Sequence, residues 1–234
     1  MAKLKVMCAR SMPVAVGALG REFAQAGGHQ IAFDFGTVGG LQAKLDAGES
    51  ADVLILSVPA IDKLEKARAL AAGSRRALAK TFIAVCVRAG APRPDIATPE
   101  AFQRTLGLAR SIALSDPAVG GSAGVYLDGL FERLGLAAMI KAKALPQPTG
   151  AEVARRVVEG KADIGLTLSG EVASVEGAVI AGPLPQPYGR DTTYCAAVSA
   201  ASAAREAATA LIAALSAPAT RATWTQAGFA LIGR

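Results

Sequence analysis

The stretch LKVMCARSMP at residues 4–13 decides how the rest of the sequence is interpreted. Its first half is a short apolar run of the kind that a buried strand requires. Arg10 and Ser11 make a polar loop, and Pro13 is tolerated in the first turn of a helix that we expect at residues 13–26. Ser11 is placed to cap that helix. The stretch therefore predicts a strand, a short polar loop and a helix in immediate succession.

Three later loops have the same character, because each ends a predicted strand and begins a predicted helix. They are Gly36-Thr37-Val38-Gly39-Gly40, Ser115-Asp116-Pro117 running on to Gly120-Gly121-Ser122-Ala123-Gly124, and Pro148-Thr149-Gly150-Ala151-Glu152. The first turn of a helix has unpaired backbone N–H groups and about half a positive charge. Several helix starts that converge on one point bind anions. The loops therefore predict a protein that binds a small anion.

Strands and helices alternate up to the continuous apolar run Val53–Leu56, an order typical of a doubly wound α/β sheet whose ligands bind beyond the carboxyl ends of the strands. A long strand at residues 82–88 leaves this first part, and an extended segment at residues 183–187 returns to it. We therefore expect two lobes, with a ligand cleft between them that closes on the ligand. Lobe 1 comprises residues 1–82 and 191–234, and lobe 2 comprises residues 83–190.

The other predicted elements follow from the spacing of apolar residues and from the positions of glycine and proline. Further strands are expected at residues 30–35, 111–115, 143–145, 162–167 and 193–198. Further helices are expected at residues 41–47, 60–71, 99–108, 121–134, 151–159, 200–215 and 218–226.

The composition fits a globular protein and argues against several classes of partner. Hydrophobic residues make up 52% of the chain, and the mean hydropathy of +0.36 reflects alanine rather than a run of about 18 apolar residues that could span a membrane. The net charge is +6, but the basic residues are scattered, with pairs only at Arg75-Arg76 and Arg155-Arg156. We therefore expect no nucleic-acid partner and no membrane insertion. A diffuse positive charge suits the attraction of a small anion.

The N-terminus only faintly has the character of a signal peptide. Lys3 and Lys5 precede the apolar residues 6–9, but Arg10 and Pro13 interrupt the apolar stretch and no small-residue cleavage site follows. We interpret the segment as a first strand, which predicts a cytoplasmic location for the chain as written. A signal removed from upstream of this sequence would instead predict a periplasmic location.

The cysteines and the single histidine carry little chemical signal. Cys8, Cys86 and Cys195 lie far apart in sequence, which excludes a disulfide framework and offers no zinc pattern. We interpret each as a small buried residue on a strand, with a reactive thiol at Cys8 as the alternative because it adjoins the first loop. His29 is expected to be exposed and remote from the site, and we reject it as a catalytic base. The sequence indicates no metal and no cofactor.

Several short stretches, taken in order and spacing, resemble the molybdate-binding periplasmic proteins and their relatives of the type II solute-binding fold. They are Ala9–Met12, Phe35–Leu41, Ala47–Val53, Ser115–Tyr126 and Ala162–Gly165. The resemblance covers essentially the whole chain. It implies the type II periplasmic-binding-protein fold, in which backbone N–H groups and hydroxyls at helix starts hold an oxyanion.

Carried over by position, the resemblance assigns roles to individual residues. Ser11 matches the first ligand serine, and Ala123 and Val153 match positions that act through the backbone. Val38 falls where molybdate binders have a serine, with Thr37 beside it. Leu168 falls where several of them have a tyrosine. Two lost hydroxyl donors weaken a site for a compact tetrahedral dianion, so we favour an organic di- or tricarboxylate over molybdate.

A second group of stretches is more similar to the aconitate isomerases than to the molybdate-binding proteins. The aconitate isomerases are themselves similar to proteins of the type II solute-binding fold. They are Ala91–Ile96, Arg104–Leu106, Ala109–Ala113, Leu130–Gly135 and Gly182–Pro185. This resemblance implies a carboxylate ligand, but it does not carry over a catalytic residue. An isomerase that moves a double bond needs a base for a carbon-bound proton. The candidates are Glu152, Asp116, Tyr194 and Cys8, and none lies in a diagnostic motif.

The candidate ligand-binding residues come from all four loops. For Ser11 and Thr37, capping and ligand contact are both open. Arg10 pairs with a carboxylate or is a solvated surface charge, and Gly39 allows a tight turn or opens the backbone to a ligand. Asp116 is expected to brace its loop. The full set is Arg10, Ser11, Thr37, Val38, Gly39, Ser122, Ala123 and Val153.

The sequence thus predicts a solute-binding protein that captures a small anion. The first alternative is an isomerase of an unsaturated tricarboxylate, similar to aconitate isomerase. The second is the molybdate- or tungstate-binding component of an ABC transporter, which would work with a permease if the chain is exported. In either case we expect a monomer.

Overall fold

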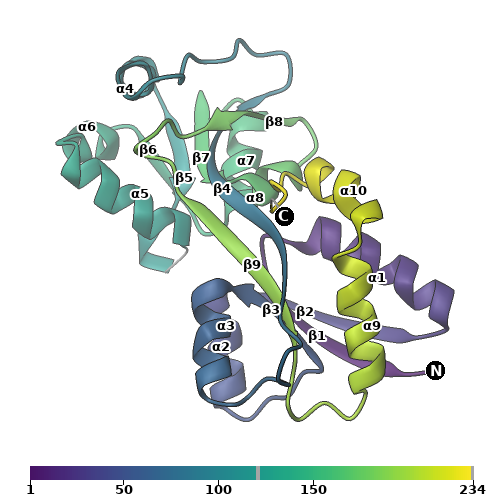
Figure 1. Cartoon of the computed structure of the whole chain (residues 1–234). Coiled ribbons are helices and arrows are strands. Elements are labelled where there is room, and N and C mark those ends of the chain that lie inside the picture. The colour runs from purple at the N-terminus through teal and green to yellow at the C-terminus, as the bar shows by residue number, and fades with distance from the viewer. Residues whose placement is uncertain (120–121, 233–234) are drawn as a thin grey trace. The chain divides into compact units, whose positions relative to one another are not determined.

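The structure is a computed structural model that describes residues 1–119 and 122–232. The chain divides into two compact units, which we call unit 1 (Met1–Thr81 with Thr192–Arg234) and unit 2 (Phe82–Asp191). Each unit is a sheet with helices packed on it (Figure 1), which confirms the predicted α/β class. Gly120 and Gly121 of the predicted glycine-rich loop lie outside the described residues. In the described part of the chain, no helix has the length and apolar character needed to cross a bilayer.

The sheet of unit 1 contains three parallel strands. Its order is β2, β1, β3, β9, and β9 runs antiparallel to β3. The pairing of β1 with β2 ends at Ala9 opposite Gly36, so the loops that follow these strands leave the same edge of the sheet. The strands are β1 (Lys3–Ala9), β2 (Gln30–Gly36), β3 (Val53–Ser57) and β9 (Asp191–Val198).

Both faces of this sheet are covered, which explains why its strands are apolar throughout. Val6 faces one core, with residues of α1, α9 and α10, and Met7 faces another, with residues of α2 and α3. This alternation follows from the two-residue period of a strand. The helices are α1 (Pro13–Gly27), α2 (Val38–Asp46), α3 (Val58–Lys66), α9 (Arg205–Leu215) and α10 (Arg221–Gln226), with a 3-10 turn at Pro218–Thr220.

The sheet of unit 2 also contains parallel strands that end at one edge. Strands β6, β5 and β7 are parallel neighbours, and β4 runs antiparallel to both β7 and β8. The carboxyl ends of β6, β5 and β7 therefore meet at one edge of the sheet. The strands are β4 (Arg76–Arg88), of which residues 82–88 belong to unit 2, β5 (Ile112–Ser115), β6 (Ala144–Gln147), β7 (Ile164–Leu168) and β8 (Ala178–Pro183).

The helices of unit 2 cover two cores. Phe102 of α4 and Leu127 of α5 lie in one, and Val153 and Val157 of α7 lie in the other. The helices are α4 (Pro99–Leu108), α5 (Ser122–Arg133), α6 (Ala137–Lys141), α7 (Gly150–Val158) and α8 (Ser169–Ala173), with a 3-10 turn at Pro117–Val119.

The predicted elements agree with the structure except at some boundaries and three short elements. Helix α2 starts at Val38 rather than at residue 41, because Thr37 caps it. Helix α3 ends at Lys66 rather than at residue 71, because Arg68 turns the backbone with a positive φ of 56°. Helix α9 starts at residue 205 rather than 200. Elements α6, α8 and β8 were not predicted, since each lacks a periodic pattern long enough to detect.

His29 corrects one expectation, because its ring is half-buried rather than exposed. The ring stacks on Phe23 with centroids 5.0 Å apart, and its Nδ1 accepts a hydrogen bond from the N–H of Ala2 at 3.2 Å. The histidine therefore fixes the start of β1 against the end of α1.

Helix α5 approaches the end of β5 closely at Gly124, and a substitution at this position tests that packing. A Cβ there would lie 2.5 Å from the Ser115 carbonyl oxygen, which is backbone and cannot move aside cheaply. We expect Gly124→Ala to destabilise the protein by about 1–3 kcal/mol, because overpacking outweighs the gain in helix propensity. Urea unfolding measures the change.

Gly129→Ala on the same helix is the matched control. Its Cβ would lie 3.4 Å from the flexible end of Arg133. This variant should be stabilised by up to about 1 kcal/mol. Equal stability of the two variants would contradict the packing of α5 on β5.

Candidate functional site

Three loops of unit 1 leave the same edge of its sheet. Ser11 follows β1, Thr37 follows β2 and Ser57 ends β3, and all three strands are parallel. The N–H of Arg10 donates to the carbonyl of Gly36 at 2.8 Å and so holds the first loop against the second. The half-buried Arg10 is therefore anchored through its backbone. This edge of the sheet brings together the predicted residues of unit 1.

Ser11 does not cap α1, which corrects the sequence prediction. Met12 occupies the N-cap position, and the cap has no side-chain hydrogen bond. The buried Ser11 hydroxyl instead donates to the phenol oxygen of Tyr194 at 3.1 Å. Tyr194 reaches it because β9 pairs with β3 in a register that sets Tyr194 opposite Ser57. Ser11 and Tyr194 thus form a pair of hydrogen-bonded, buried hydroxyl groups at the carboxyl edge of the unit 1 sheet.

The start of α2 combines a cap with an open backbone. Thr37 Oγ1 accepts a hydrogen bond from the N–H of Gly40 at 3.0 Å, so Thr37 is the cap. The cap leaves the first-turn N–H groups of Val38 and Gly39 for other acceptors. The side chain of Val38 packs on the core, whereas Gly39 is exposed and has open space where a Cβ would lie. The backbone of this turn is therefore accessible.

The start of α5 in unit 2 lies directly on the end of β5. Asp116 Oδ1 accepts a hydrogen bond from the N–H of Ala118 at 2.9 Å, which confirms that Asp116 braces its loop. Ser122 is exposed at the first position of α5, and Ala123 is buried against the core. Of this pair, only Ser122 presents its side chain to solvent.

The start of α7 has a threonine cap like that of α2. Thr149 Oγ1 accepts a hydrogen bond from the N–H of Glu152 at 3.1 Å. The N–H of Val153 donates to the Thr149 carbonyl at 3.1 Å, so it serves the helix itself. The first-turn N–H groups outside the cap belong to Gly150 and Ala151. These two residues, rather than Val153, offer the backbone donors of this helix.

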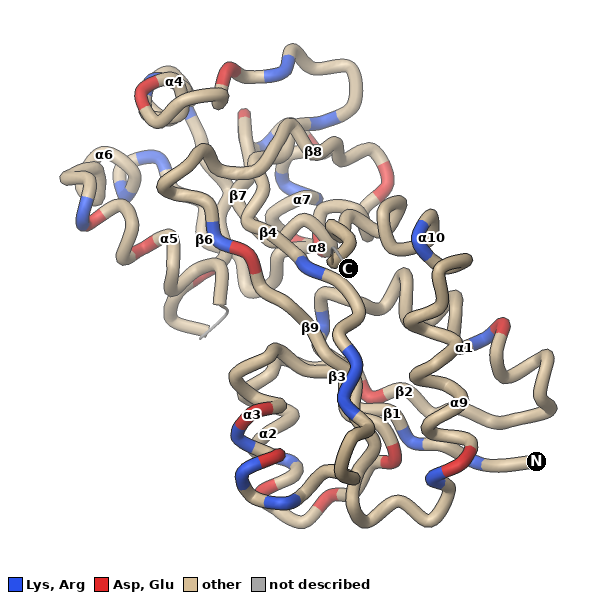
Figure 2. The backbone as a smooth tube through the Cα atoms, viewed as in Figure 1, with Lys and Arg blue, Asp and Glu red and all other residues tan. Residues whose placement is uncertain are grey.

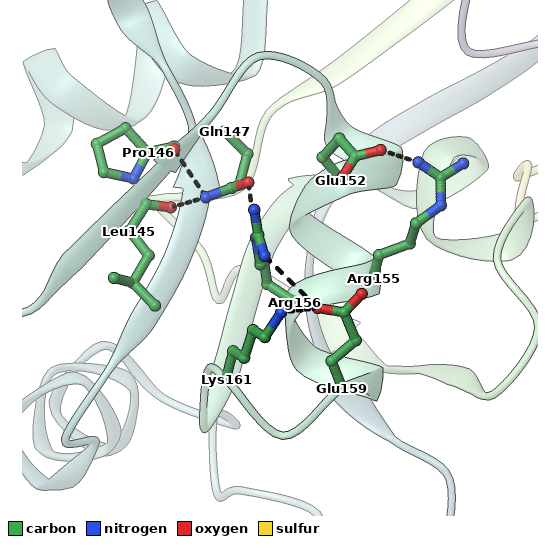
Figure 3. Close-up of polar contacts among 8 residues, drawn as sticks. All are labelled: Leu145, Pro146, Gln147, Glu152, Arg155, Arg156, Glu159 and Lys161. Atoms are coloured by element: carbon green, nitrogen blue, oxygen red, sulfur yellow. Dashed lines mark hydrogen bonds and ion pairs between the residues drawn. The ribbon is translucent and has the colours of Figure 1, made fainter.

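A polar network braces α7 against β6 (Figure 3). The buried Gln147 donates through Nε2 to the carbonyls of Leu145 and Pro146, and its Oε1 accepts from Arg156 Nε at 3.1 Å. Arg156 also pairs with Glu159 at 3.5 Å. The network holds the α7 helix in place relative to the edge from which it starts.

Sequence reasoning missed a buried hydroxyl–carboxylate chain at the edge of unit 2. Ser115 is the last residue of β5, Thr167 is the residue before the end of the neighbouring parallel strand β7, and their hydroxyl oxygens lie 3.1 Å apart. Thr167 Oγ1 donates to Glu171 Oε2 at 3.1 Å, and all three residues are buried. Glu171 is the one charged residue between positions 164 and 175. An isolated carboxylate in an apolar stretch is the signal that could have found it.

The candidate bases differ in their surroundings. Glu152 forms an ion pair with Arg155 on the surface of α7 (Figure 3), and Asp116 serves its own loop. Burial raises the pKa of the Cys8 thiol far above its ordinary value and raises the pKa of Cys86 to about 12. All three cysteines are buried and free, as predicted, and the alternative of a reactive Cys8 is wrong.

Charge and metal ligands add little to the site. Figure 2 shows Lys and Arg distributed over both units and interleaved with Asp and Glu. Among residues 1–119 and 122–232, no group of three or more His, Cys, Asp or Glu is placed to hold a metal ion. Apart from the Glu171 carboxylate, the polar groups described at the two sheet edges are mainly backbone N–H groups and hydroxyls, a donor set suited to anions.

Each unit has parallel strands with a threonine-capped helix start at their carboxyl edge, the arrangement that the sequence predicts for a solute-binding protein. The chain belongs to the family of bacterial extracellular solute-binding proteins, whose model matches residues 4–230. It is 40% identical over 173 residues to an aconitate isomerase from a Pseudomonas species. That match covers 72% of this chain and 63% of the relative, so the chain spans less than two thirds of the relative's length.

Solved structures support the same fold at lower identity. The periplasmic molybdate-binding protein of Azotobacter vinelandii is 20% identical, with a TM-score of 0.74 over 98% of this chain and 100% of that one. The sulfate-binding protein SubI of Mycobacterium tuberculosis is 19% identical, with a TM-score of 0.72 over 98% of this chain and 86% of that one. The predicted type II solute-binding fold is therefore confirmed.

Thiol titration tests the burial of the cysteines. With a disulfide reagent at about pH 8, we expect none of Cys8, Cys86 and Cys195 to react in the native protein, because all three are buried away from the reagent. In Cys8 and Cys86, burial also raises the pKa of the thiol and so disfavours the reactive thiolate. All three should react after denaturation. A fast-reacting thiol in the native protein, lost in Cys8→Ser, would restore the reactive-thiol hypothesis.

Removal of the Tyr194 hydroxyl tests the buried pair with Ser11. We expect Tyr194→Phe to lower the free energy of unfolding by about 1–3 kcal/mol, because a buried donor loses its acceptor. Tyr188→Phe is the control, since the Tyr188 hydroxyl accepts from Gln103 at a half-buried position in unit 2 and should matter less. Urea unfolding compares the two, and an equal loss would argue against the buried pair.

Proposed function

We propose that this solute-binding protein captures a small organic di- or tricarboxylate. The observation that carries the proposal is the recurrence of capped helix starts with small residues at the carboxyl edges of parallel strands. Unit 1 offers the N–H groups of Val38 and Gly39, with the hydroxyls of Ser11 and Thr37. Unit 2 offers the N–H groups of Gly150 and Ala151. Backbone N–H groups at helix starts hold carboxylates without a formal positive charge.

The remaining candidate residues lie at the start of α5, after β1 and on α7. Ser122 and Ala123 begin α5, and the Ala123 side chain leaves little bulk beside the backbone. The Arg10 side chain follows β1 directly and would pair with a second carboxylate of the ligand. Val153 contributes by packing α7 on its core rather than by a donor of its own.

The preference for a carboxylate over molybdate rests on two apolar positions. Val38 packs on the core of unit 1, and Leu168 is 8% exposed at the end of β7. Neither provides a hydroxyl to a tetrahedral dianion, and a site short of two donors rejects a ligand that needs them. The 40% identity to an aconitate isomerase supports a carboxylate ligand as well.

An isomerase of an unsaturated tricarboxylate is the second candidate function. The same 40% identity favours it, together with the Ser11–Tyr194 pair, which sets a phenol beside a proposed ligand residue. The third candidate is a molybdate- or tungstate-binding component of an ABC transporter, working with a permease. A periplasmic location would accompany a transport role.

Ligand screening by thermal shift, followed by calorimetry, tests the proposal. The panel is citrate, cis- and trans-aconitate, simple dicarboxylates, molybdate, tungstate and sulfate. A ligand at about a hundred times its dissociation constant stabilises the folded state by about 2.7 kcal/mol. We expect a tricarboxylate to give the largest shift. A large shift with molybdate alone would overturn the carboxylate assignment.

In the proposed complex the Ser11 hydroxyl turns from the phenol oxygen of Tyr194 to donate to the ligand. Ser11→Ala should therefore weaken binding of the best ligand by about tenfold or more, because a hydrogen bond to a charged group contributes about 1.5–3 kcal/mol. Ser216→Ala is the control, since the Ser216 hydroxyl donates to the Ile212 carbonyl at the end of α9. Equal affinities of the two variants would remove Ser11 from the site.

Incubation with cis- or trans-aconitate, followed by chromatography, separates binding from catalysis. Interconversion that Ser11→Ala or Tyr194→Phe slows would establish the isomerase. Tight binding without interconversion would establish a receptor.

A further inference from the structure

A buried carboxylate lies at the carboxyl edge of unit 2, where the proposed function expects an anion to bind. Glu171, on α8, is 7% exposed, and its Oε2 accepts a hydrogen bond from Thr167 Oγ1 at 3.1 Å. The Thr167 hydroxyl lies 3.1 Å from that of Ser115; Ser115 is the last residue of β5, and Thr167 is the residue before the last in β7. Through these hydrogen bonds, the Glu171 carboxylate is held at the carboxyl ends of β5 and β7, the edge of the sheet that carries the proposed site residues of unit 2.

The carboxylate also touches the first turn of α7, which lies beside α8 (Figure 1). A Cβ at Gly150 would lie 2.0 Å from Glu171 Oε2 and 2.1 Å from Thr167 Oγ1. No side chain larger than glycine fits there without displacing the carboxylate. Gly150 therefore allows the Glu171 carboxyl group to sit directly against a helix N-terminus, where its ionised form interacts favourably with the helix dipole.

This arrangement has a consequence for any ligand at the start of α7. The positive end of the helix already has an anionic neighbour in Glu171, so a second anion meets less net attraction. In a buried environment, like charges a few ångströms apart repel each other far more strongly than they do in water. This repulsion grows with the total charge of the ligand, and it grows further when that charge is localised on a few neighbouring atoms. A compact dianion suffers most, and an extended carboxylate that keeps its charged groups apart suffers least.

We propose that Glu171 is a specificity-determining residue that makes the site reject compact dianions such as tungstate and molybdate. This inference rests on the proposed function and deepens it. Val38 and Leu168 withhold donors from a tetrahedral dianion, and Glu171 adds a repulsive element. Binding proteins become selective by including such repulsion against the wrong ligand as well as attraction for the right one.

The test compares two tetrahedral oxyanions of similar size and different charge, tungstate and perrhenate, together with trans-aconitate. Calorimetry measures all three with the unchanged protein, Glu171→Gln and Glu159→Gln. Glu159 is the matched control, because it follows the opposite end of α7 and is paired with Lys161 at 2.9 Å. We expect Glu171→Gln to raise the affinity for tungstate relative to perrhenate by tenfold or more. Glu159→Gln should leave the ratio within about twofold of that of the unchanged protein.

The outcomes separate this inference from the proposed function. The inference is overturned if Glu171→Gln has the same ratio of tungstate affinity to perrhenate affinity as the unchanged protein and still binds trans-aconitate. That result leaves the proposed function standing. No binding of any of the anions by any of the proteins overturns both.

A second variant guards against failure to fold. Glu171→Met removes the charge with a side chain of similar length, and circular dichroism checks both variants before calorimetry. If neither folds, the unchanged protein decides the question. Tungstate bound a hundredfold more tightly than perrhenate would overturn the inference, and perrhenate bound equally or more tightly would support it.

Discussion

The parallel pairing of strands within each sheet is the constraint on which the rest of the structure depends. Parallel neighbours end at the same edge, so the loops after β1, β2 and β3 are gathered there without any direct attraction between them. The same holds for β6, β5 and β7 in unit 2. Apolar burial on both faces of the sheets stabilises this pairing, and the polar edge follows from it. The candidate site is thus a consequence of how the cores are made.

Helix capping then decides which backbone groups remain at that edge. Thr37 and Thr149 each satisfy one first-turn N–H with their own hydroxyl, and in each helix the N–H groups of the two residues after the cap lie outside it. The small residues Gly39 and Gly150 stand at these positions. The space beside Gly39 is open, whereas the space beside Gly150 is filled by the Glu171 carboxylate of helix α8. Two helix starts with the same cap therefore present different electrostatic surroundings to a ligand.

Most of the fold was predictable from the sequence, because apolar runs and loop residues report local structure directly. The strands were located within a few residues, apart from the early start of β4 and the unpredicted β8, and the resemblance to solute-binding proteins is confirmed by the match over residues 4–230. The side-chain partners were not predictable in the same way. For Ser11, capping of α1 and contact with a ligand were both open, yet its hydroxyl donates to Tyr194, a residue 183 positions away along the chain. Glu171 was overlooked because its contacts with Thr167 and Gly150 arise only when β7, α7 and α8 are packed together. Long-range pairing of polar groups has no local signature.

The route of the chain through the two units also bears on how the protein is made. Unit 2 is one continuous segment, whereas unit 1 is assembled from both ends of the chain, with β9, α9 and α10 arriving last. During synthesis, the ribosome releases all of unit 2 before β9 can pair with β3, so the first three strands wait with an unpaired, apolar edge. Such edges recruit strands from other chains. The nascent protein is therefore most exposed to aggregation in the interval before β9 appears, and a chaperone that shields β3 would act in that interval.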